Sequence, residues 1–145
     1  IYTMSILSNN EAHGDFTNVV VLDYKDLIAI GNAGQQTIAV IPAGGSVEIV
    51  QVDETVAFAG TTSLVLDIGT TTGDPDEFID ALDVDAMTVP VANTGDLFTS
   101  GYSQVVSPVA SDTNIVLEVT DAAIASATAG KVTIGLRILN PRRFS

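Results

Sequence analysis

Residues 42–82 read PAGGSVEIVQVDETVAFAGTTSLVLDIGTTTGDPDEFIDAL, a stretch in which turn residues alternate with runs of β-forming residues. A Pro-Ala-Gly-Gly turn leads into a long strand, and a second strand follows over residues 63–69. A polar, acidic loop over residues 70–78 comes next. The stretch contains no chemically reactive motif. It predicts a β-sandwich with one large decorated loop, and it favours a scaffold, binding or shell role over catalysis.

The same alternation continues outside this stretch. Apolar residues recur at every second position in residues 63–69, 115–120 and 131–138, which predicts strands with one buried face. The predicted buried residues are Leu64, Leu66, Ile68, Ile115, Leu117, Val119, Val132, Ile134, Leu136 and Ile138. Further strands are expected over residues 19–22, 27–30 and 37–41. In residues 47–52 the apolar phase slips between Ile49 and Val50, which predicts a β-bulge or a strand that changes sheets.

Short strands separated by frequent Gly, Pro and Asn turns predict one all-β domain. The expected fold is a single-domain antiparallel β-sandwich, jelly-roll-like, with at most one or two short helical turns. Asp76–Val84 is one helical candidate, with Asp76 as its N-cap. Asp121–Ala129 is the other, because it is rich in Ala, although it could equally connect two strands.

The chain divides into three expected parts. Residues 17–140 form the sandwich, residues 141–145 form a basic C-terminal tail, and residues 1–16 form an N-terminal arm or a first strand. As an arm, its apolar residues Tyr2, Met4 and Ile6 would add a strand to a neighbouring sheet. As a first strand, they would belong to the chain's own sandwich. The sequence begins with Ile1 rather than Met, so we expect a processed or trimmed form.

Composition excludes several functions. The 145 residues include 18 acidic and 5 basic side chains, so the net charge is −13, which disfavours both nucleic acid and anionic membranes as partners. The chain has no Cys, which excludes disulfides and thiolate metal sites and indicates synthesis in a reducing cytoplasm. Since 46% of the residues are hydrophobic, the chain is expected to fold. No run is long and apolar enough for a membrane span, and no signal-peptide layout is present.

No catalytic constellation stands out, so we predict that the protein is not an enzyme. The single histidine, His13, has Asp15 nearby but no nucleophilic serine in a suitable context, and an exposed turn histidine is expected instead. Carboxylate pairs are common, but the chain has no Trp and few other aromatic residues to form a sugar platform. No catalytic residue is therefore assigned.

The acidic loop is a weak candidate for a calcium site. Asp74, Asp76 and Asp80 cluster there with Glu77, and Asp67 ends the preceding strand. Oxygen ligands of this kind suit Ca²⁺, although the spacing departs from the EF-hand pattern. The alternative is a solvated loop whose Asp side chains form turns and caps. We expect no cofactor, with calcium kept as the alternative.

Two further segments are candidate contact surfaces. Residues 87–110 are irregular and carry Phe98 and Tyr102, either as contact residues on a loop or as core residues of two edge strands. Arg142, Arg143 and Phe144 form a basic, aromatic end on an acidic chain. That end is either a docking element or a solvated terminus.

The motifs resemble those of small virion proteins of tailed bacteriophages. The residues that carry the resemblance are IPAG at 41–44 leading into VEIV at 47–50, SLVLDIG at 63–69, DPDEFI at 74–79 and AGKVTI at 129–134. Capsid decoration (cement) and head-fibre proteins share this pattern of a strand, a DPDxF loop and a closing AGKV strand. The resemblance covers about half of the chain, residues 37–82 and 111–140.

The resemblance implies a structural virion protein that binds the outer surface of a phage capsid and stabilises capsomer junctions. Its expected partners are the major capsid protein and further copies of itself in a homotrimer, with no nucleic acid and no membrane. Its expected location is the capsid exterior, after synthesis in the host cytoplasm. The expected contact residues are Tyr2, Met4, Ile6, Phe98, Tyr102, Arg142, Arg143 and Phe144. The alternative is a receptor- or glycan-binding module of a head or tail fibre, with calcium held by Asp74, Asp76 and Asp80.

Overall fold

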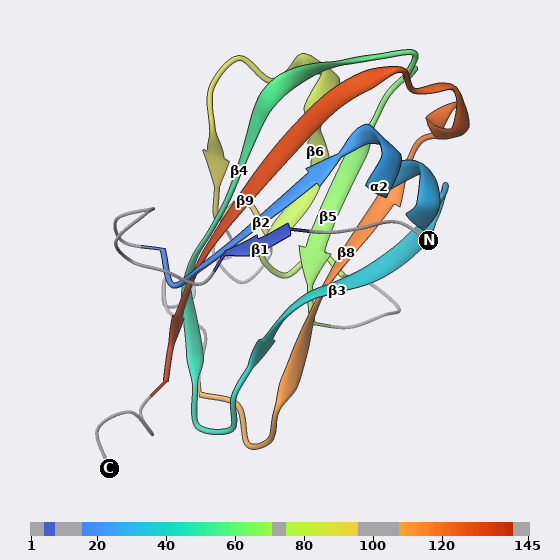
Figure 1. The fold of residues 1–145 in the computed structure, drawn as a ribbon. Helices are drawn as coiled ribbons and strands as arrows, with labels where there is room; N and C mark the ends of the chain where they lie inside the picture. The colour runs from blue at the N-terminus through green and yellow to red at the C-terminus, as the bar shows by residue number, and fades with distance from the viewer. Residues whose placement is uncertain (1–4, 8–15, 71–74, 96–107, 141–145) are drawn as a thin grey trace.

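A computed structural model describes residues 5–7, 16–70, 75–95 and 108–140, in which two antiparallel sheets form a sandwich (Figure 1). Sheet A has the strand order β1 (Ser5–Leu7), β2 (Asn18–Asp23), β9 (Ala129–Leu139), β4 (Ser46–Ala59) and β7 (Val91–Ala92). Sheet B has the order β3 (Gly34–Ile41), β8 (Thr113–Thr120), β5 (Val65–Gly69) and β6 (Ile79–Asp83). The predicted all-β antiparallel sandwich is confirmed, and the jelly-roll detail stays a prediction.

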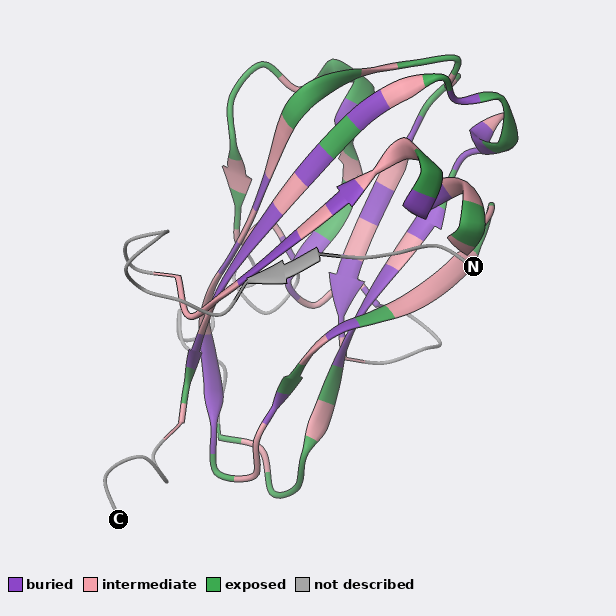
Figure 2. Cartoon of the chain, in the orientation of Figure 1, coloured by how far each residue is buried: buried purple, intermediate pink, exposed green. Residues whose placement is uncertain are grey.

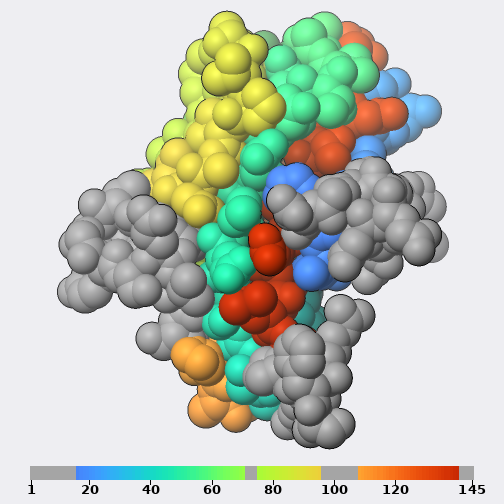
Figure 3. Space-filling view, turned by 90° about the vertical axis from the view of Figure 1, so that its left-hand side faces the viewer, coloured from blue at the N-terminus to red at the C-terminus, as the bar shows by residue number. Residues whose placement is uncertain are grey.

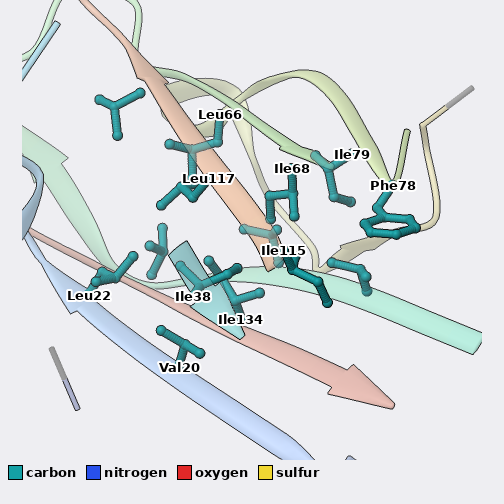
Figure 4. Close-up of a cluster of buried hydrophobic side chains, with 14 of the residues drawn as sticks. Val20, Leu22, Ile38, Leu66, Ile68, Phe78, Ile79, Ile115, Leu117 and Ile134 are labelled. Atoms are coloured by element: carbon teal, nitrogen blue, oxygen red, sulfur yellow. The ribbon is translucent and has the colours of Figure 1, made fainter. Parts of the chain in front are cut away.

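The core lies between the two sheets and follows the alternation that the sequence predicts. From sheet A, Val20, Leu22 and Ile134 point toward side chains of sheet B (Figure 4). All ten residues predicted to be buried are buried, and Figure 2 shows this alternation along the strands. Because a fully buried aliphatic side chain contributes about 1.5–3 kcal/mol, this two-sided core is the main source of stability.

The predicted bulge in β4 is confirmed, but it lies earlier than expected. Val47 pairs with Ile138 and Ile49 pairs with Arg137, so two β4 residues advance while β9 advances by one. The extra residue is therefore Glu48, whose carboxylate lies 3.0 Å from Nε of Arg137. Both side chains are partly exposed, so this ion pair contributes at most about 1 kcal/mol.

The strand predicted over residues 27–30 is wrong, because these residues belong to helix α2 (Tyr24–Ile30). A capping box begins the helix. The backbone N–H of Asp26 donates to Oδ1 of Asp23, and the N–H of Asp23 donates to Oδ2 of Asp26, both at 3.0 Å. Gly31 ends the helix with φ +84°, a conformation that glycine adopts without strain. The two caps therefore turn an apolar run into a helix.

The two predicted helical segments are mostly not α-helical. Residues 79–83 of the first form β6, and only its last residue enters the 3₁₀ turn η1 (Val84–Ala86), so the proposed N-cap at Asp76 is wrong. The second contains the 3₁₀ turn η2 (Ile124–Ser126) and otherwise connects β8 to β9, as the alternative expected. Asp121 is buried there and accepts hydrogen bonds from the N–H groups of Ala123 and Thr62.

The loops of the sandwich gather at its two ends (Figure 1). The helix α2 and the turns η1 and η2 lie at the upper end of the view. The β3–β4 turn, the segment that enters β8 and the last residues of β9 lie at the lower end. In the described part of the chain, no helix has the length and apolar character needed to cross a membrane.

Candidate partner-binding end

In the residues that the structure describes, the lower end of the sandwich carries almost no charge. We call it the low-charge end and define it as residues 40–46, 108–114 and 138–140, in which Asp112 is the single ionisable side chain. We call the opposite end the acidic end, because it contains six carboxylates and two lysines: Asp23, Asp26, Glu54, Asp83, Asp85, Asp121, Lys25 and Lys131. The two ends of the sandwich therefore differ in net charge.

A tight turn forms the centre of the low-charge end. The N–H of Gly45 donates to the carbonyl of Pro42 at 2.7 Å, and Gly44 has φ +82°, as the third position of a type II turn requires. Gly45 has no room for a side chain, since a Cβ there would lie 2.7 Å from the carbonyl oxygen of Leu139. The consecutive glycines thus let the turn pack directly against the end of β9.

Backbone hydrogen bonds hold the neighbouring segment against this turn. The N–H of Gly44 donates to the carbonyl of Val109 at 2.7 Å, and the N–H of Val109 donates to the carbonyl of Gly45 at 2.9 Å. The N–H of Ala43 donates to Oδ1 of Asp112 at 2.9 Å, so the single carboxylate of this end is already hydrogen-bonded. A surface ordered in this way loses little conformational entropy when a partner binds.

Apolar side chains are exposed around the turn. Val40 on β3 is 48% exposed and Leu139 at the end of β9 is 37% exposed. Gly44, Pro108 and Ala110 of the same end are also exposed. In Figure 3 orange and teal atoms lie at the bottom of the view, and red atoms of β9 lie above them. The end thus exposes apolar side chains together with the polar residues Ser111, Asp112 and Asn114, and it is ordered, which suits a docking surface.

Most of the predicted contact residues lie outside the described residues: Tyr2, Met4, Phe98, Tyr102, Arg142, Arg143 and Phe144. The backbone of Ile6 lies in β1, opposite Val20 of the chain's own β2. The described chain resumes at Pro108 and stops at Asn140, and both residues belong to the low-charge end. Two of the predicted contact segments are therefore covalently attached to this end.

The acidic loop is partly described, and its side chains mostly bond to the chain itself. Both carboxylate oxygens of Glu77 accept hydrogen bonds from Thr70, and Asp67 accepts one from the N–H of Ala81. Asp76 is partly buried and Asp80 is exposed on β6, while Asp74 lies outside the described residues. In the described residues, no group of three His, Asp or Glu side chains is arranged to hold a metal ion. The calcium site stays a prediction.

A second feature, which the sequence analysis missed, is a hollow on the outer face of sheet A. It has a volume of about 170 Å³ and is lined by Phe16, Val19, Gln51, Asp53, Thr133 and Gly135. Strands β2, β9 and β4 lie side by side on the face shown in Figure 3. The signal for it was Gly135, since a glycine inside a strand often marks the close approach of another group.

Comparison with known proteins gives a structural likeness. No protein-family model and no curated protein matches the chain. A chain of the cyanophage Pam1 capsid asymmetric unit superposes with a TM-score of 0.53 and 18% identity, over 86% of each chain. A chain of the acidic stable capsid structure of Helicobacter pylori bacteriophage KHP30 aligns over 95% of this chain and 99% of that chain, with 11% identity. The second TM-score, 0.38, is too low for a fold assignment, whereas the first indicates a shared fold.

Proposed function

We propose that this protein is a structural, non-enzymatic component of a phage virion that binds the outer capsid surface and stabilises the junctions between capsomers. The fold it shares with a chain of the Pam1 capsid asymmetric unit supports a place in the virion. The major capsid protein is the proposed partner. The low-charge end is the proposed docking surface, and the acidic end faces solvent.

The distribution of charge is the observation that carries this proposal. Burying an unpaired carboxylate costs several kcal/mol, so a protein of net charge −13 binds best through a surface that lacks carboxylates. The low-charge end has one carboxylate, Asp112, and the N–H of Ala43 already donates to it. The acidic end remains hydrated in this arrangement and keeps the decorated particle soluble.

A stable attachment buries on the order of 1,000 Å² or more, which exceeds what the turn at residues 42–45 offers alone. The segments 96–107 and 141–145 adjoin this end through Pro108 and Asn140. We propose that Phe98, Tyr102 and Phe144 extend the contact with the capsid, and that Arg142 and Arg143 contact acidic groups of a neighbouring subunit at the junction. A homotrimer in which copies support one another at a capsomer junction is the proposed assembly.

Two matched valines test the docking surface. Val40 at the low-charge end is 48% exposed. Val56, on β4 near the acidic end of the sandwich, is 47% exposed. We expect Val40→Asp to weaken binding to purified capsids that lack this protein by at least about tenfold, because the new carboxylate would be buried at the interface. Val56→Asp should bind like the unmodified protein. Co-sedimentation over a range of protein concentrations measures both affinities.

The thermal unfolding midpoints of the two variants provide the control for folding, since both substitutions replace an exposed strand valine. Equal binding by Val40→Asp and Val56→Asp would show that the low-charge end is not the docking surface. Failure of the unmodified protein to sediment with capsids would contradict capsid attachment itself.

A further inference from the structure

We infer that the hollow on the outer face of sheet A binds an arginine side chain from residues 141–145 of a second copy of this chain. The proposal concerns self-association and does not depend on attachment to a capsid. It is carried by the chemistry of the hollow, by the small number of cations in the chain, and by the position at which β9 ends.

The hollow lies on the outer face of sheet A, beside Gly135. Gly135 of β9 is paired with Val19 of β2 on one side and with Gln51 of β4 on the other. The ring of Phe16 lies over this glycine, since a Cβ at position 135 would come within 2.8 Å of three ring atoms. The neighbouring row of the sheet adds Asp53, which is paired with Thr133.

The walls of the hollow combine an aromatic ring with unpaired polar groups. Among the described residues, neither the carboxylate of Asp53 nor the side-chain amide of Gln51 has a hydrogen-bond or ion-pair partner. Asp53 is half-buried and lines the cavity. Phe16 and Asp53 both line the hollow, and an aromatic ring and a carboxylate are the two groups that a planar guanidinium binds best. An arginine side chain is therefore the ligand that this hollow suits.

The chain itself supplies the candidate arginines. Of the three cations in the described residues, Arg137 is paired with Glu48 and Lys25 lies 5.9 Å from the centroid of the Tyr24 ring. Lys131 is at the acidic end of the sandwich, opposite Asp23. The two cations that remain are Arg142 and Arg143. On a chain of net charge −13, these two arginines are the natural complement of an unpaired carboxylate on another copy.

The course of β9 favours insertion into a second copy over insertion into the same copy. Gly135 lies five residues before Asn140, or roughly 16 Å along an extended strand. To reach its own hollow, the chain would have to reverse direction immediately after Asn140. Because the next residue is Pro141, Asn140 prefers an extended conformation, which disfavours such a reversal. Such a head-to-tail contact closes into a ring or continues as a filament.

A complementation experiment with full-length chains tests this inference. The first variant, Asp53→Asn, keeps both arginines and the shape of the hollow but removes the charge of the hollow. The second variant, Arg142→Ala/Arg143→Ala, keeps the hollow but removes the arginine side chains. We expect the unmodified chain to self-associate, and each variant alone to self-associate at least about tenfold more weakly. An equimolar mixture should recover a one-to-one complex, because it contains one intact hollow and one intact ligand.

Analytical ultracentrifugation of each chain and of the mixture measures these equilibria. Asp83→Asn serves as the matched control, because Asp83 is an exposed carboxylate at the opposite end, and it should associate like the unmodified chain. Self-association of Asp53→Asn with undiminished affinity would overturn the inference. A monomeric unmodified chain would overturn it as well, and so would a mixture that fails to associate. Since no capsid takes part, these outcomes are separate from those that test capsid attachment.

Discussion

At the scale of single residues, glycines shape both the low-charge end and the hollow on sheet A. The tandem Gly44-Gly45 predicts a turn from the sequence alone, because Gly accepts a positive φ. The contact between Gly45 and the carbonyl of Leu139 could not be predicted, since the two residues are far apart in the chain and meet only when β4 pairs with β9. The same reason hid the hollow, because Phe16 and Gly135 belong to opposite ends of the sequence.

The substitution Gly45→Ala tests the close packing of the turn. A Cβ at this position would lie 2.7 Å from the carbonyl oxygen of Leu139 and 2.8 Å from that of Pro42, so backbone must move. We expect the free energy of unfolding to fall by about 2–3 kcal/mol, as measured by urea denaturation. An unchanged free energy of unfolding in Gly45→Ala would contradict a steric role for Gly45.

At the scale of elements, period-2 alternation predicted the central strands β5, β8 and β9 and the bulge in β4. It failed at residues 27–30, where a short apolar run fits a strand and a helix equally well. The local signal that decides between them is the Asp23-x-x-Asp26 spacing, which forms a capping box. The segment 121–129 was ambiguous for a related reason. Its alanines favour a helix, but the connection from β8 to β9 overrides this weak propensity.

The cap of α2 gives a prediction at this scale. Asp23→Ala removes the side chain that accepts from the N–H of Asp26, and it leaves one helix donor without a partner. The free energy of unfolding should fall by about 1 kcal/mol, measured by denaturant titration. Asp83→Ala is the matched control, because Asp83 occupies the N-cap of η1 without a side-chain hydrogen bond to it. A loss of equal size in Asp83→Ala would show that capping is not the cause.

At the scale of the whole molecule, the fold separates an acidic end from an end with little charge. The sequence predicts the net charge but not its separation, because the low-charge end combines three segments that the two sheets bring together. The segments that the sequence singled out as contact surfaces include two that are attached at Pro108 and Asn140 of this end. Composition and alternation thus predicted the class of fold, whereas the low-charge end could be recognised only from the topology.

The proposed function is tested most directly by the protein content of purified phage particles. Quantitative mass spectrometry of these particles gives the copies of this chain relative to the major capsid protein. A component of capsomer junctions should be present at a fixed ratio comparable to that of the major capsid protein, since the junctions repeat with the capsid lattice. Only a few copies per particle would point instead to the fibre-module alternative, and the absence of the chain from particles would contradict a virion role.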